Sequence, residues 1–354
     1  MLNLGILNLS NNYFSGHIPH SIGNLIDMIS LVLRNNKFSG GLPFLFNLTN
    51  LEVVDAMNNN LSGTIPSWIG SKLPNLTFLN LKSNHFHGNL GGLCNLEQIK
   101  VLDISSNNVS GSIPTCILNF NFLAQTSYKN DYDNFYYHRN DLVMMWKGEE
   151  RLITKETMKL ERSIDLSCNH LSGKIPNEIT ELVGLINLNL SRNELTGQIP
   201  DKIGQLQSLD SLDVSRNHLF GPIPSSLSQV SRLGVLDLSY NNLSGKIPTG
   251  TQLQGFSTPS YEGNPYLCGD PLKKCFEEIS QEPNINNVHV ENENEDEDKL
   301  FGREFLISMA FRFIVGFWGI FGSFVLNRRW RHAYFKFVRC GNQLKTGTFS
   351  PFII

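Results

Sequence analysis

The sequence predicts an α/β solenoid, built on a curved parallel β-sheet and followed by one transmembrane helix. Three observations predict this fold: the composition, a repeat of about 24 residues, and an apolar run near the C-terminus. The 354 residues include 48 Leu and 40 Asn, whereas only 17% are charged. This composition suits one turn repeated many times better than a compact enzyme. The net charge of −3 argues against a broadly basic nucleic-acid-binding protein.

One segment recurs through most of the chain. Its first copy, residues 7–19, reads Leu-Asn-Leu-Ser-Asn-Asn-Tyr-Phe-Ser-Gly-His-Ile-Pro. Successive copies of its third Asn, Asn12, are separated by 24, 23, 25, 23, 62, 24, 24 and 24 residues. Nine copies in this register predict stacked structural repeats, with the Asn at positions 12, 36, 59, 84, 107, 169, 193, 217 and 241.

The chemistry of one copy explains why the copies must stack. In Leu-x-Leu, both apolar side chains point to the same side of a short strand, and no single copy can bury them. The Asn follows where the chain turns, and stacking would align its amides in a ladder that bonds to the open backbone groups. In the return segment, Gly relaxes the backbone, and we expect Pro to prevent a second ladder of strands.

The repeat pattern is interrupted once. Five copies fall in residues 1–114 and four in 161–248, and the pattern is absent between them. Residues 115–160 are either a decayed repeat that loops out or an island that projects from the solenoid. The aromatic residues of 128–137, and Trp146, Lys147 and Glu149 after them, favour an island suited to contacts with partners.

Cysteines mark the end of the solenoid and one place inside it. A solenoid end exposes its core, so we expect a cap over residues 249–276, closed by a small disulfide loop between Cys268 and Cys275. Cys94 and Cys116 lie at nearly the same phase of adjacent repeats, which suggests a second disulfide. Cys168 has no evident partner in the sequence and is expected to be a free thiol.

The C-terminal residues predict a single membrane crossing. Residues 305–326 are apolar except for Arg312 and two serines, and at 1.5 Å per residue a helix of this length spans about 33 Å. A buried amphipathic helix would instead need polar residues at helical spacing. Nine acidic residues lie between Glu277 and Asp298 in the preceding segment, 277–304, and six basic residues but no acidic ones lie in the tail, 327–354. This asymmetry predicts a cytosolic tail and extracellular repeats.

Glycosylation sequons agree with that topology. None lies after the apolar run, although an Asn-rich and Ser-rich repeat produces some by composition alone. The acceptors are Asn8, Asn47, Asn60, Asn75, Asn108, Asn189 and Asn242.

The repeat resembles the plant-specific class of leucine-rich repeat, Leu-x-x-Leu-x-x-Leu-x-Leu-x-x-Asn-x-Leu-Ser-Gly-x-Ile-Pro. That class occurs in receptor-like kinases, receptor-like proteins and small secreted inhibitors of fungal pectinases. Trp-Lys-Gly-Glu at 146–149, followed by four repeats, resembles the island of receptor-like proteins. The cap and residues 316–322 and 330–337 resemble the C-terminal parts of the same family. The tail is too short for a kinase domain and lacks kinase signatures.

The resemblance implies a non-enzymatic receptor at the plasma membrane, single-pass and type I, that acts in defence or development. It would bind an extracellular peptide, protein or glycan and signal through a single-pass receptor kinase as co-receptor, with no cofactor, metal or nucleic acid. An inhibitor-like binding solenoid and a nonfunctional receptor remnant are the alternatives. The chain opens inside a repeat without a signal peptide, so we expect a fragment or a truncated gene product.

Alternation places candidate binding residues on the concave face of the strands, where we expect them to be exposed. The recurring Asp could instead support neighbouring turns. The candidates on the last four strands are Asp165, Asn189, Asp213, Arg216, Asp237 and Tyr240.

In the membrane segment, small residues predict a helix-packing surface at Gly316, Gly319, Gly322 and Ser323. Arg312 is either a contact with a partner helix or a neutral change. The aromatics of residues 334–337 are either interfacial anchors or an endocytic signal.

Overall fold

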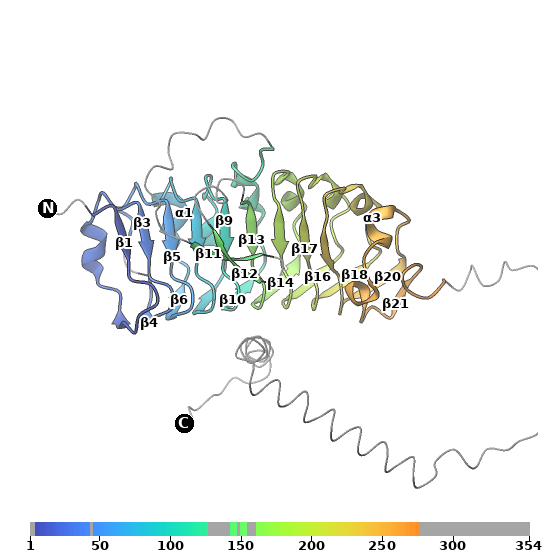
Figure 1. The fold of residues 1–354 in the computed structure, drawn as a ribbon, viewed down its shortest axis with the longest axis horizontal. Coiled ribbons are helices and arrows are strands. Elements are labelled where there is room, and N and C mark those ends of the chain that lie inside the picture. Colours follow the sequence, from blue (N-terminus) through green and yellow to red (C-terminus); the bar gives the residue numbers. More distant parts are fainter. Residues whose placement is uncertain (1–3, 43–44, 127–141, 147–148, 154–160, 276–354) are drawn as a thin grey trace, which may run out of the picture. The chain divides into compact units, whose positions relative to one another are not determined.

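The computed structural model describes residues 4–42, 45–126, 142–146, 149–153 and 161–275, except for the side chains of 142–153. These residues belong to one compact unit, Met1–Gln281, which is a stack of repeated turns seen side-on in Figure 1. Among the described residues, no helix is long and apolar enough to cross a membrane. The predicted membrane segment, 305–326, lies outside them.

The Leu-x-Leu segments form one parallel nine-stranded sheet, here called the first sheet. Strand β9 pairs directly with β13, with Leu102 opposite Ile164, so the chain leaves the stack for residues 115–160 and returns to the same register. The strands are β1 (Ile6–Asn8), β3 (Ser30–Val32), β5 (Val53–Asp55), β7 (Phe78–Asn80), β9 (Val101–Asp103), β13 (Ser163–Asp165), β15 (Asn187–Asn189), β17 (Ser211–Asp213) and β19 (Val235–Asp237).

A second parallel sheet of ten strands forms where none was predicted. The expectation that Pro would prevent it is wrong, because the strand ends before the Ile-Pro pair in the copies that have one: β6 ends at Thr64 and Pro66 follows outside it. The strands are β2 (Ser15–His17), β4 (Lys37–Gly40), β6 (Asn60–Thr64), β8 (His85–Gly88), β10 (Asn108–Gly111), β14 (His170–Lys174), β16 (Glu194–Gly197), β18 (His218–Gly221), β20 (Asn242–Lys246) and β21 (Tyr266–Cys268).

The repeated Asn joins neighbouring turns of the solenoid through its amide. Asn193 is typical: its Nδ2 donates to the carbonyls of Leu190 (3.0 Å) and Ser191 (3.2 Å) in its own repeat and of Leu166 (3.1 Å) in the preceding one. Its Oδ1 accepts the N–H of Leu171 at 3.0 Å. The amides therefore bond to backbone groups across each repeat boundary, as the predicted ladder requires.

The ladder extends beyond the copies recognised in the sequence. Asn169 accepts the N–H of Val109 at 3.0 Å, although 60 residues separate the two, so the ladder is unbroken at the insertion. Asn264 in the cap makes the same bonds to Leu243, Leu238 and Tyr261. The cap thus completes the last repeat with a tenth Asn and with β21, which pairs with β20.

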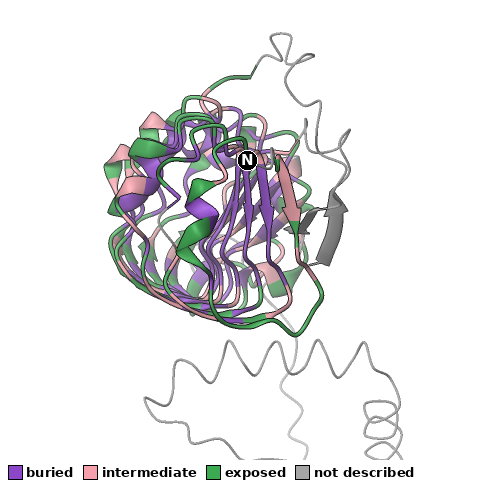
Figure 2. Ribbon diagram, turned by 90° about the vertical axis from the view of Figure 1, so that its left-hand side faces the viewer, coloured by how far each residue is buried: buried purple, intermediate pink, exposed green. Residues whose placement is uncertain are grey.

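The apolar residues of the repeats form one continuous core between the sheets and a row of short helices. Leu31, Leu79, Leu102, Leu188 and Leu212 are each at most 2% exposed. Figure 2 looks along the solenoid and shows the first sheet on one side and the helices on the other. The helices are η1 (His20–Asn24), α1 (Trp68–Lys72), η2 (Gly91–Leu93), η3 (Thr115–Asn119), η4 (Asn177–Glu181), η5 (Ile203–Gln205), η6 (Ser225–Gln229), α3 (Thr251–Gln254) and η7 (Thr258–Tyr261).

The interrupting segment contains an antiparallel hairpin of β11 (Leu142–Trp146) and β12 (Glu149–Ile153). This hairpin is a separate two-stranded sheet and joins neither sheet of the solenoid. A decayed repeat would keep its strand in the stack, so the topology favours the island interpretation.

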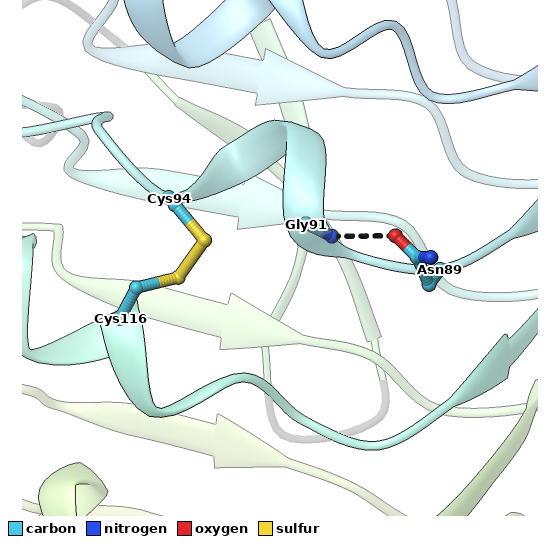
Figure 3. The surroundings of a disulfide bond; sticks show 4 residues. All are labelled: Asn89, Gly91, Cys94 and Cys116. Atoms are coloured by element: carbon cyan, nitrogen blue, oxygen red, sulfur yellow. Dashed lines mark hydrogen bonds between the residues drawn. A yellow bond between two sulfur atoms is a disulfide. The ribbon is translucent and has the colours of Figure 1, made fainter.

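Two disulfides join neighbouring segments of the described chain. Cys94 follows η2 and is bonded to Cys116 in η3, with the Cα atoms 5.2 Å apart, so this bond links two adjacent repeats on the helical side (Figure 3). Cys268 and Cys275 are bonded within the cap, with the Cα atoms 5.1 Å apart. Cys168 is also disulfide-bonded, so the expectation of a free thiol is wrong.

Candidate functional site

The last residues of the strands from β5 to β19 form a row of polar side chains on the outward face of the first sheet, whereas β3 ends at the apolar Val32. Parallel register places Asp103 opposite Asp165, Asp165 opposite Asn189, Asn189 opposite Asp213 and Asp213 opposite Asp237. Asp55 and Asn80 continue this row toward the N-terminus. The row therefore spans the insertion, because the strands on its two sides are adjacent.

Each member of this row supports the turn that follows it. The side-chain oxygen accepts the backbone N–H two residues later, at 2.9 Å for Asp165 and Asp213, 3.0 Å for Asn189 and Asp237, and 3.3 Å for Asp55. This is the geometry of an Asx-turn, which replaces the strand hydrogen bond that the turning chain gives up. The turn-supporting interpretation of the recurring Asp thus has a direct structural basis.

Burial divides the row into two patches. The covered patch contains the outward residues of β5 to β13, and the open patch contains those of β15 to β19. Asp55, Asp103 and Asp165 are 0%, 3% and 4% exposed, whereas Asp213 and Asp237 are partly exposed. The expectation that alternation exposes Asp165 is wrong, because the outward face of a strand is exposed only where nothing packs on it.

Burial also changes the acidity of these carboxyl groups. Burial raises the pKa of Asp165 to about 7, and the neighbouring Asp103 raises it further. Burial likewise raises the pKa of Asp55 to about 7, although the Arg34 guanidinium, 3.4 Å away, opposes the shift. In the open patch, burial raises the pKa of Asp213. Neutral or paired carboxyl groups are the expected state of such buried positions.

The open patch gains two cations and an aromatic ring from the turns after β15, β17 and β19. Arg192, Arg216 and Tyr240 occupy the same turn position, each in the left-handed region with φ of 56°, 54° and 54°. The Arg216 guanidinium lies 4.0 Å from the centre of the Tyr240 ring, a cation–π contact. Burial lowers the pKa of Arg192, and the charge of Arg216 lowers it further.

The described side chains of the open patch are of the types found in recognition surfaces. Its carboxylates support turns, and guanidinium groups are hydrogen-bond donors. The patch therefore presents both charges and one aromatic ring to a binding partner. Arg192 was not predicted as part of this site. Arg192 precedes Arg216 by one repeat of 24 residues, and this spacing could have identified it, because both residues occupy the same left-handed position of the turn.

The other predicted residues are placed as follows. Trp146 and Glu149 face each other across the hairpin register, and Lys147 lies outside the described residues. Gly316, Gly319, Gly322, Ser323 and Arg312 also lie outside them. In the described part of the chain, no cluster of His, Cys, Asp and Glu could hold a metal ion.

Comparison with known proteins identifies the repeats and their family. Models described as leucine-rich repeat match residues 162–219, and also 3–25, 50–72, 98–120 and 232–252. Receptor-like protein EIX2 of Solanum lycopersicum is 45% identical over an alignment of 396 residues, which covers 95% of this chain and 39% of that protein. Receptor-like protein EIX1 of the same species is 53% identical over 303 residues, which covers 81% of this chain and 29% of that protein.

A solved structure shares the fold. The Arabidopsis receptor kinase HAESA, in complex with the peptide hormone IDA and the co-receptor SERK1, is similar with a TM-score of 0.58 and 30% identity over 76% of this chain and 43% of that one. The chain spans less than half of the curated relatives it matches, 39% and 29%. Its repeats are a binding fold and not an enzyme. The chain belongs to the leucine-rich-repeat receptor-like proteins of plants.

Proposed function

We propose that this chain is part of a plasma-membrane receptor of type I topology, with extracellular repeats that bind a ligand and a single-pass receptor kinase as co-receptor. The relatives EIX2 and EIX1 are named receptor-like proteins, and the similar HAESA structure contains a peptide hormone and a co-receptor. Signalling would depend on the partner kinase, as in the receptor-like proteins that the sequence resembles. Defence or development is the expected setting.

The observation that carries this proposal is the open patch. Within the polar row from β5 to β19, it contains the residues that remain partly accessible, and it lies on the repeats between the insertion and the cap. Interfaces favour Arg and Tyr at their centres, with complementary charges that fix orientation. Arg216 stacked on Tyr240, beside Asp213 and Asp237, provides such a combination on adjacent strands.

The island is the proposed second contact. Its hairpin brings Trp146 opposite Glu149, at the end next to Lys147. A segment that leaves a rigid scaffold at one point and carries aromatic residues is suited to ligand recognition. The extracellular partner could be a peptide, a protein or a glycan.

The test is charge reversal in the open patch. Asp213→Lys together with Asp237→Lys should reduce co-purification of single-pass receptor kinases from plant membranes by about tenfold or more, the equivalent of ~1.4 kcal/mol. Glu181→Lys is the matched control, because Glu181 is exposed at the end of η4 on the helical side. Unchanged co-purification by the double variant would remove the open patch from the proposal.

The topology has a separate test. Protease added outside intact cells should digest the repeats and spare an epitope placed after residue 327.

Within the membrane segment, we propose that Gly316, Gly319, Gly322 and Ser323 pack against the kinase helix. Arg312→Gly then distinguishes two roles: weaker association would make Arg312 a contact, and stronger association would make it a lesion.

A further inference from the structure

Three sequons lie at the same place on the outward face of the second sheet. Asn60, Asn108 and Asn242 are the first residues of β6, β10 and β20, and all three are exposed. Each directly follows a buried ladder Asn, so the ladder Asn fixes the backbone while its neighbour points outward. The side-chain nitrogen of an exposed Asn in this position is accessible for a sugar.

Asn189 is a sequon of a different kind. It lies on the first sheet and is only partly exposed, and both ends of its amide are used. Its Oδ1 accepts hydrogen bonds from the Ser191 N–H (3.0 Å) and hydroxyl (2.7 Å), while its Nδ2 donates to Asp165 Oδ2 at 3.3 Å. A sugar on that nitrogen would stand between Asp165 and Asp213 and would disturb the row that supports the turns.

Phe220 provides a further observation on the second sheet. Phe220 is 47% exposed, so a large part of its apolar surface faces solvent. Phe220 is the direct cross-strand partner of Asn242, so the two side chains leave the sheet side by side on the same face. The apolar face of a pyranose attached to Asn242 could pack on this ring. The equivalent partner of Asn108 is His87.

We propose that the folded protein carries N-glycans on the second sheet at Asn60, Asn108 and Asn242 but none at Asn189, and that the first sugar at Asn242 covers Phe220. This inference rests on the extracellular placement in the proposed function, since sugars are added in the secretory pathway. Its consequence is that these three sugars occupy the second sheet, while the open patch of the first sheet stays free for a protein partner.

The site occupancy can be measured directly. The full chain is expressed in leaf tissue behind a cleavable secretion signal, and its glycopeptides are quantified by mass spectrometry after enzymatic release of the sugars in heavy-oxygen water. The expected result is high occupancy at Asn60, Asn108 and Asn242 and none at Asn189. Occupied Asn189, or empty second-sheet sites beside occupied ones elsewhere, would overturn the inference. A secreted chain with no sugar at any sequon would also overturn the inference, whereas the extracellular placement itself is tested by the protease experiment above.

The contact with Phe220 is tested by a double-mutant cycle on the same glycosylated protein. Asn242→Gln should lower the thermal midpoint by about 2–4 °C more than Asn108→Gln does, because only the former uncovers an aromatic ring. In a Phe220→Ser background this difference should disappear. If the two Gln variants have equal midpoints, or if the difference persists without Phe220, the sugar does not cover the ring.

Discussion

Replacing one buried ladder residue, Asn217→Ala, tests how far the amides hold the repeats together. Asn217 is 6% exposed and donates to the carbonyls of Leu190 (3.0 Å), Val214 (3.1 Å) and Ser215 (3.2 Å). Its Oδ1 accepts the Leu195 N–H at 3.0 Å. Alanine leaves these backbone groups buried and unpaired at the boundary between two repeats.

The magnitude follows from those bonds. Two amide hydrogens and one oxygen make about three effective hydrogen bonds, each worth about 1 kcal/mol net, and an unpaired buried group costs more than the bond contributes. We therefore expect Asn217→Ala to lower the free energy of unfolding by about 2–4 kcal/mol. Asn12→Ala is the matched control: Asn12 is exposed and donates to Leu9 and Ser10 of its own turn. It should cost less than about 1 kcal/mol.

Urea denaturation gives both free energies, and amide hydrogen exchange gives the local effect. The Leu195 N–H should lose protection in the Asn217→Ala variant while amides several repeats away keep theirs, because a solenoid is stabilised by nearest-neighbour interfaces. Equal costs for Asn217→Ala and Asn12→Ala would refute the reasoning, since the two differ in the bonds across the repeat boundary.

Three further predictions concern other parts of the solenoid. Asp165 has a pKa of about 7 in the folded state against 3.8 as the reference value, so the folded state binds this proton more tightly and stability falls as pH rises between about 4 and 7. Asp165→Asn should therefore leave stability at pH 4 nearly unchanged and raise it at pH 8 by up to a few kcal/mol; a flat difference across this range would contradict the assigned burial. Gly204→Ala should lower stability by about 1–3 kcal/mol or prevent folding, because the added Cβ would lie 2.1 Å from the Ser226 carbonyl oxygen; an unchanged urea midpoint would show that η5 and η6 are less closely packed. Arg216→Glu should weaken partner binding more than Tyr240→Phe, which keeps the ring under the guanidinium; equal losses in a pull-down assay would show that the phenol hydroxyl, and not the ring, makes the contact.

The repeated strand and turn could be predicted because each copy contains the same apolar residues and the same Asn at the same spacing. Leu-x-Leu followed by Asn fixes a strand and a turn whatever the neighbours are, so the first sheet, its parallel order and the amide ladder follow from spacing. Asn264 escaped notice because the cap lacks the Leu-x-Leu strand before it, although its amide makes the same bonds.

The remaining features depend on packing that spacing does not encode. The second sheet forms because Pro comes after the paired residues and not among them, a difference of one or two positions. Alternation predicts the side of the sheet on which Asp165 lies, but whether that side is covered is a tertiary property. For the same reason, the sequence indicated Arg216 but not Arg192, which belongs to the patch only because the two turns align in the stack.

The proposed contact between the open patch and a receptor kinase can be detected directly by photocrosslinking in plant cells. A photoreactive amino acid would replace Asp213 in one variant and Gln205, exposed on the helical side in η5, in the other. After irradiation, crosslinked partners would be identified by mass spectrometry. We expect a single-pass receptor kinase to be captured from position 213 and not from position 205. Capture from position 205 alone, or equally from both positions, would contradict it.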